Sequence, residues 1–260
     1  MPYPILQIPT LIVYLLFFAR VLGIMVSAPI FGARAIPSRI KIGFSLILAY
    51  LFYILYTPTQ LHLSLDNNLL AILMLVSAEL LLGIFIGYIA LLIFSVIQFC
   101  GNLIDIMTGM HVASVLDPMT HEQQSLLGQF QYILALLLFL NFNGHHFILH
   151  ALNKSFSMLP LGTLSFKITD PSTFIGIVNS TFVIGFQLAT PIIAILFLID
   201  FSLGIIAKGV PQMNVFMTGM PLKSMVGFFA LLIALLYYSE YFKHLPLFVY
   251  KNIVQALHSL

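Results

Sequence analysis

Hydrophobic residues along this chain gather into long runs separated by short polar segments. The runs cover residues 5–31, 42–56, 69–99, 126–142, 174–207 and 224–242, and a weaker run covers 147–160. A helix needs about 20 apolar residues to cross the hydrocarbon core of a bilayer. The pattern therefore predicts an all-α chain of membrane-associated helices. No clear internal repeat or low-complexity tract divides it, so we expect a single domain over residues 1–260.

The lengths of these runs do not suit a regular membrane bundle. As one helix, the run 69–99 extends about 46 Å at 1.5 Å per residue, against a hydrocarbon core of about 30 Å. The run 174–207 is longer, and Pro191 interrupts its backbone hydrogen bonds. The run 42–56 is short. We therefore expect helical hairpins, some of them bent, that pack on other subunits.

The C-terminal stretch has the pattern of an amphipathic helix. Val249, Ile253, Leu257 and Leu260 recur on one face of a helical wheel, and polar residues occupy the remainder. Such a face packs on a membrane surface or a partner, or on the protein's own core. The sequence leaves both possibilities open.

Composition strengthens the membrane interpretation. Hydrophobic residues make up 61% of the chain and charged residues 7%, with a mean hydropathy of +1.09. Ordinary soluble domains carry about 25% charged residues. The chain is therefore expected to be an integral membrane protein, or a subunit almost wholly buried in an assembly. Its ten basic residues form no dense cluster, so nucleic acid is not an expected partner, and the lone Cys100 excludes an internal disulfide.

The charges of the loops give an incomplete topology. Arg34, Arg39 and Lys41 crowd one loop and favour a cytoplasmic position for it, whereas loop 57–68 has no basic residue. Loop 100–125 should be cytoplasmic again, yet it carries three acidic residues and no lysine or arginine. Its position stays open.

No constellation of residues indicates catalysis. His121 and Glu122 resemble the start of a zinc-protease motif, but Ser125 stands where the second histidine is needed. The segment 145–150 contains three histidines without a carboxylate or thiol nearby, so we favour a structural role for them. Neither a nucleophile elbow nor a phosphate-binding glycine loop is present. We expect no catalytic residue, no metal site and no cofactor.

Three charged residues, Arg20, Glu79 and Asp200, lie inside apolar runs. Ionised groups are costly there and are usually paired or face water. They are candidates either for a proton or ion path or for buried structural pairs, such as Arg20 with Glu79. Each run holds too few titratable groups for a relay, so we favour the structural pair.

Two loops rich in methionine, 107–119 and 208–223, are the remaining candidates for function. Flexible methionines, together with glycine and proline, suit a deformable seal around a moving chain, although methionine also fills gaps in ordinary cores. The candidate residues of the first loop are Met107, Gly109, Met110, Val115, Asp117, Pro118 and Met119, and those of the second are Pro211, Gln212, Met213, Asn214, Phe216, Met217, Gly219 and Pro221.

An ordered set of residues across nearly the whole chain resembles the family of the flagellar biosynthetic protein FliR, which includes counterparts in virulence type III secretion. The segments "PQMNVF" and "FNGHH" are its most specific parts. One departure is Met107-Thr108, where the family pattern has a glutamine-methionine pair. The set comprises Arg20, Gly23, Pro29, Pro37, Glu79, Gly83, Gly87, Asp105, Gly109, Asp117, Pro118, "FNGHH" at 142–146, Ser155, Phe156, Pro160, Pro191, "PQMNVF" at 211–216 and "PLK" at 221–223.

The resemblance implies a non-enzymatic core subunit of the flagellar type III export gate. It implies a location in the bacterial inner membrane, in the flagellar basal body. It implies FliP-like and FliQ-like subunits as partners in a helical hetero-oligomer, FlhB and FlhA as neighbours, and unfolded flagellar proteins as cargo. In that family the loop matching 106–122 reaches into the lumen as a plug.

Two other classes of function remain as alternatives. A proton-coupled membrane transporter would use Glu79, Asp200 and the histidines, and should show matching broken helices in two halves. The sequence offers one strong break, at Pro191. A membrane-embedded hydrolase would need a nucleophile or a metal set, and the sequence shows neither.

Overall fold

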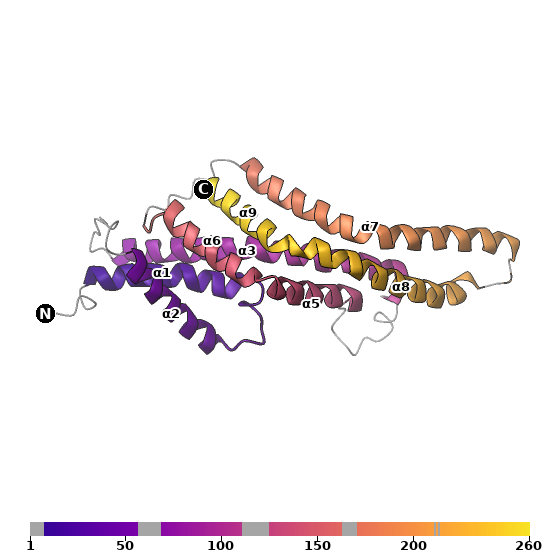
Figure 1. The fold of residues 1–260 in the computed structure, drawn as a ribbon, viewed down its shortest axis with the longest axis horizontal. Coiled ribbons are helices and arrows are strands. Elements are labelled where there is room, and N and C mark those ends of the chain that lie inside the picture. The colour runs from indigo at the N-terminus through magenta and orange to yellow at the C-terminus, as the bar shows by residue number, and fades with distance from the viewer. Residues whose placement is uncertain (1–7, 57–68, 111–124, 163–170, 211, 213) are drawn as a thin grey trace. The chain divides into compact units, whose positions relative to one another are not determined.

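The computed structural model describes residues 8–56, 69–110, 125–162, 171–210, 212 and 214–260, and over these ranges it is helical without a strand (Figure 1). The expected all-α class is confirmed. The helices are α1 (Ile8–Ser27), α2 (Ser38–Tyr56), α3 (Leu69–Thr108), α5 (Leu126–Asn141), α6 (Gly144–Met158), α7 (Pro171–Gly209), α8 (Val215–Lys243) and α9 (Leu245–His258).

Four of these helices are long and apolar enough to cross a membrane: α2, α3, α7 and the part of α8 from Met217 to Lys243. The number is five if α5 and α6 together form one broken span. Helix α3 has 40 residues and α7 has 39. Each therefore extends about 60 Å, roughly twice the thickness of a hydrocarbon core. Pro191 lies inside α7, so it removes a hydrogen bond without ending the helix.

The chain divides into two compact units. Residues 1–92, 145–177 and 247–260 form the first unit, and residues 93–144 and 178–246 form the second. The boundary crosses α3 and α7, so the units are interleaved along the chain. The single-domain expectation for residues 1–260 stays a prediction.

In the first unit, glycines allow α1 and α3 to cross with their backbones in contact. A Cβ added to Gly23 would lie 2.5 Å from the carbonyl oxygen of Leu80, and a Cβ added to Gly83 would lie 3.0 Å from the Cα of Gly23. Small residues permit such close approach of helices. This crossing sets the distance between the side chains that α1 and α3 carry around it.

Helix α9 completes the first unit. Its apolar face, with Val249, Ile253 and Leu257, is at most 2% exposed. Of the two possibilities that the sequence left open, the structure shows the second, because this face packs on the protein's own core. Tyr250, on a neighbouring face, makes an edge contact with Phe147 of α6 at 6.2 Å between ring centroids.

The second unit packs the C-terminal part of α3 against α5, α7 and α8. Phe94 of α3 meets Phe139 of α5 edge to face, with ring centroids 5.2 Å apart. The hydroxyl of Tyr238 in α8 donates to the carbonyl of Leu188 in α7 at 2.7 Å. These contacts join α3 to α5 and α7 to α8 within the second unit.

Candidate functional site

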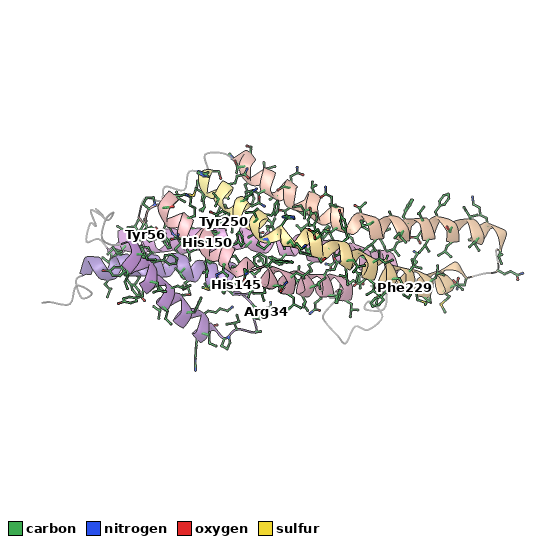
Figure 2. The ribbon with its side chains drawn as sticks, in the orientation of Figure 1. Arg34, Tyr56, His145, His150, Phe229 and Tyr250 are labelled. Atoms are coloured by element: carbon green, nitrogen blue, oxygen red, sulfur yellow. The ribbon has the colours of Figure 1, made fainter. Side chains whose placement is uncertain are left out.

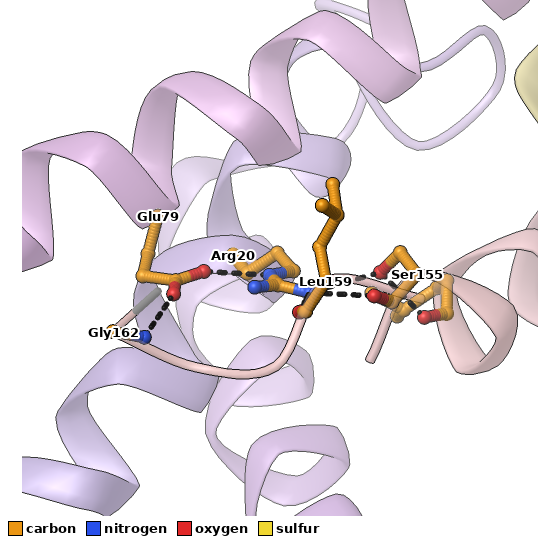
Figure 3. A network of polar contacts seen from close by, with 6 residues as sticks. Arg20, Glu79, Ser155, Leu159 and Gly162 are labelled. Carbon is orange, nitrogen blue, oxygen red and sulfur yellow. Dashed lines mark hydrogen bonds and ion pairs between the residues drawn. The ribbon is translucent and has the colours of Figure 1, made fainter. Parts of the chain in front are cut away.

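The first candidate site is a buried ion-pair cluster on three helices of the first unit (Figure 3). Arg20 Nε of α1 donates to Glu79 Oε2 of α3 at 2.6 Å, and both side chains are fully buried. Arg20 Nη1 donates to the carbonyls of Ser155 at 3.1 Å and Leu159 at 3.0 Å. The other carboxylate oxygen, Glu79 Oε1, accepts from the N–H of Gly162 at 3.1 Å.

In this cluster, Arg20 caps the C-terminal end of α6 by donating to its last carbonyls. The carbonyls at the end of a helix carry partial negative charge, so a guanidinium is favourable there. The carbonyl of Ser155 also accepts the N–H of Leu159 at 2.9 Å, so Arg20 is its second donor. The guanidinium also lies 4.7 Å from the ring centroid of Phe156. The pair expected from sequence is therefore present, with both Glu79 oxygens engaged. The geometry favours a structural role over a proton relay, because the carboxylate is committed to two donors.

The third charged residue, Asp200, is paired and only partly buried within this chain. Its side chain is 39% exposed and forms an ion pair with Lys223, which links α7 to α8. The apolar neighbours of Asp200 along α7 are themselves exposed, so the burial of this charge stays a prediction. Phe197 is 62% exposed and Phe201 is 64% exposed.

Only the start of the first methionine-rich segment lies within the described part of the chain. Met107 belongs to α3, which ends at Thr108, and Gly109 follows with φ +81°, a left-handed conformation that commonly terminates helices. Gly109 packs beside Met220 of α8, because a Cβ added there would lie 3.2 Å from the Met220 Cε. Met110 is half-buried. Val115, Asp117, Pro118 and Met119 lie outside the described residues.

The described residues on the two sides of the stretch 111–124 are held by hydrogen bonds at the ends of α3 and α5, and we call this arrangement the segment base. At one end, the hydroxyl of Ser224 in α8 donates to the carbonyl of Thr108 at 3.3 Å. At the other end, Ser125 Oγ accepts from the N–H of Gly128 at 2.8 Å and so caps α5. The two ends meet because Asp105 Oδ2 of α3 accepts from the N–H of Leu127 at 3.3 Å.

The segment base includes residues that the sequence prediction did not select. A serine directly before an apolar run is a usual N-cap signal, so Ser125 was recognisable. Thr108 and Ser224 are 116 positions apart, and no local pattern links them. Asp105 is 2% exposed, and its Oδ1 has no hydrogen-bond partner among the described residues.

The second methionine-rich segment is mostly helical, which corrects the predicted loop at 208–223. Helix α7 continues to Gly209, and α8 begins at Val215. The side chain of Asn214 caps α8 by accepting from the N–H of Met217 at 3.2 Å. Gly219 and Pro221 lie inside α8, because packing of the helix overrides their weak helical propensity.

The remaining residues of this segment differ in exposure, because successive residues of α8 lie on different faces of the helix. Gln212 is exposed, and Met217 is 68% exposed. Gly219 is buried, and a Cβ added to it would lie 2.9 Å from the Leu203 Cδ1 of α7. Pro211, Met213 and the side chain of Phe216 lie outside the described residues.

The histidines of α6 form no described metal site. The rings of His145 and His146 contact each other in a tilted arrangement, with centroids 4.3 Å apart. Across the described ranges, no group of three or more His, Cys, Asp or Glu side chains is placed to hold a metal ion. His121 and Glu122 lie outside those ranges.

Comparison with known proteins gives one consistent result. The sequence profile of a family described as "Bacterial export proteins, family 1" matches residues 11–247. The flagellar biosynthetic protein FliR of Bacillus subtilis (strain 168) is 37% identical over 230 residues, which cover 85% of each chain. FliR of Aquifex aeolicus (strain VF5) is 32% identical over 228 residues, 86% of each chain. The surface presentation of antigens protein SpaR of Shigella flexneri is 30% identical over 165 residues, 62% of this chain and 63% of that protein.

Proposed function

Because this chain belongs to the bacterial export proteins, family 1, we propose that it is a non-enzymatic core subunit of the flagellar type III protein export gate. In this proposal it assembles with FliP-like and FliQ-like subunits in the bacterial inner membrane, within the flagellar basal body. FlhB and FlhA adjoin the assembly, and unfolded flagellar proteins pass through it. The residues from Met107 to Met119 form part of the channel plug.

The segment base carries this proposal. A plug needs fixed ends, so that the chain between them can be displaced without disturbing the helices. Asp105 joins the end of α3 to the start of α5, and Ser224 joins the end of α3 to α8. The 16 residues from 109 to 124 start and finish at this base. Fully extended, they reach at most about 55 Å, so a loop of half that height is within range.

Exposed apolar side chains on α7 and α8 support assembly with other subunits or with lipid. Leu236 is 80% exposed, Ile233 is 71% exposed and Phe197 is 62% exposed. Large apolar side chains exposed along two long helices are expected where a chain meets protein or membrane. The names of the relatives describe flagellar biosynthesis and surface presentation, not catalysis, which agrees with a non-enzymatic role.

No specific observation favours the alternative of a proton-coupled transporter. Glu79 is engaged by Arg20 and by the N–H of Gly162, and Asp200 is paired with Lys223. A transporter would require one of these carboxylates to exchange protons with water during its cycle.

The plug role is tested by removing residues 110–115 and measuring ion leakage in cells that are not exporting. We expect increased leakage with normal assembly, because the segment base stays intact. A matched pair of substitutions refines the test. Met110→Leu keeps the side-chain volume and should remain tight, whereas Met110→Ala removes contact area and should leak more. Assembled gates that carry the deletion and still retain small ions would contradict the plug role.

A further inference from the structure

The first unit also contains an open groove, which is distinct from the Arg20–Glu79 cluster and from the segment base. Its volume is about 480 Å³, and it lies between the end of α2 and neighbouring faces of α6 and α9. Tyr56 lines it from α2, His150 and Lys154 line it from α6, and Tyr250 lines it from α9. Figure 2 shows Tyr56, His150 and Tyr250 gathered in this region. We call it the α2–α6–α9 groove.

Among the described residues that line the groove, Lys154 carries a positive charge and none carries a carboxylate. In the described part of the first unit, Glu79 is the only acidic side chain, and it is fully buried in its pair with Arg20. The ammonium of Lys154 is exposed and has no ion-pair partner among the described residues. A concave surface that carries a cation without a compensating carboxylate attracts anions.

The groove also holds a positioned neutral donor. The hydroxyl of Tyr56 donates to Asn153 Oδ1 at 2.8 Å. This bond orients the amide of Asn153, so that its two N–H groups are available for a ligand. Lys154 supplies three further N–H donors on the adjacent residue. Charged and neutral donors that converge on one concave surface are suited to the oxygens of a phosphate group.

Exposed apolar side chains directly precede Tyr56 on α2. Ile54 is 52% exposed and Leu55 is 69% exposed in the turn of α2 that precedes Tyr56. Helix α2 is one of the candidate membrane spans, and its most apolar window is only 17% buried. Tyrosines commonly lie at the boundary between hydrocarbon and headgroups, because the ring is apolar and the hydroxyl is polar. Tyr56 and Tyr250 both line the groove at the end of this span.

From this juxtaposition we propose that the α2–α6–α9 groove binds the phosphate headgroup of an anionic phospholipid. Lys154 and the Asn153 amide contact the phosphate oxygens. The acyl chains lie along the exposed apolar face of α2. A free phosphate ion would use the polar donors alone, whereas a phospholipid uses both surfaces. The proposal stands on the first unit and does not depend on the role of the plug.

The test measures lipid binding to the purified full-length chain in mild detergent by native mass spectrometry. The probes are phosphatidylglycerol, phosphatidylcholine and inorganic phosphate. The variant is Lys154→Gln, which changes an exposed side chain and leaves the core intact. The matched control is Lys251→Gln, because Lys251 is also exposed and lies on α9 outside the groove lining.

The proposal expects phosphatidylglycerol to bind more tightly than phosphatidylcholine. It also expects Lys154→Gln to weaken phosphatidylglycerol binding roughly fivefold, the usual effect of one lysine near an anionic membrane surface. The control Lys251→Gln should bind as the parent chain does, and millimolar phosphate should not displace the lipid.

Three outcomes overturn the proposal. Unchanged binding by Lys154→Gln excludes the groove, and equal weakening by both variants indicates a diffuse basic surface. Displacement of the lipid by inorganic phosphate indicates a site for a soluble anion. The same variant is then compared in the gate purified from cells. Loss of a protein subunit from Lys154→Gln, with lipid binding retained, shows that the groove docks protein.

Discussion

At the scale of single residues, Arg20 shows how one buried charge organises several elements. Its guanidinium binds a carboxylate on α3 and two carbonyls at the end of α6. Burial of an ion pair does not by itself add stability, but removal of one partner leaves a charge that has neither water nor a counter-ion. The pair therefore fixes which helices lie together more than it increases their stability.

Either Arg20→Ala or Glu79→Ala alone should lower the free energy of unfolding by about 3–5 kcal/mol, because each leaves an uncompensated buried charge. The double variant should recover part of this loss. Recovery stays incomplete because the carbonyl of Leu159 loses the Arg20 donor and the N–H of Gly162 loses the Glu79 acceptor, while the carbonyl of Ser155 keeps only the N–H of Leu159. Thermal unfolding in mild detergent, together with the yield of assembled gate, measures both effects.

The matched control for this pair is Lys243→Ala, which removes an exposed ion pair with Glu240. Water screens that pair, so the midpoint of unfolding should not change measurably. Single Arg20 or Glu79 variants that assemble normally but stop proton-dependent export would restore the relay hypothesis.

A second prediction for a single residue concerns Asp105. Its carboxylate receives an N–H in the first turn of α5, where negative charge is favourable. Asp105→Ala should loosen the segment base, so the amides of the first turn of α5 exchange hydrogen faster while those of α1 keep their rates. Asp105→Asn keeps an acceptor and should have a smaller effect. Equal exchange in all three proteins would show that Asp105 does not hold the base.

At the scale of elements, close crossing of α1 and α3 depends on glycine. Long apolar runs predicted the helices well, because apolar length alone decides whether a segment is a membrane helix. They did not predict the crossing, because the contact of Gly83 with Gly23 joins residues 60 positions apart. They also failed at 208–223, where Asn214 caps α8 and Gly219 and Pro221 are held inside it.

Gly83→Ala should therefore destabilise the first unit. The added methyl group would lie 3.0 Å from the Cα of Gly23 and would also meet the backbone of Arg20, so the helices must separate. Overpacking of this kind costs about 1–3 kcal/mol. The control is Gly43→Ala in α2, where nothing lies within 4 Å of the added atom. That change should be neutral or slightly stabilising, and thermal unfolding compares the two. Equal midpoints for both variants would refute the crossing argument.

At the scale of the whole molecule, each unit has its own core, and much apolar surface is left exposed. Helices of 39 and 40 residues exceed the hydrocarbon thickness, and exposed phenylalanines flank Asp200 on α7. The resemblance in sequence indicated an assembly, which agrees with this surface. Sequence alone did not predict the interleaving of the units, because it depends on contacts between segments far apart in the chain.

The central claim is that this chain works as one subunit of a hetero-oligomeric export gate. The most direct test is the composition and mass of the complex that co-purifies with the tagged full-length chain from its native membrane in mild detergent. The account predicts a single large complex that contains two other membrane proteins, of the FliP-like and FliQ-like kinds. A complex that contains only copies of this chain would contradict it.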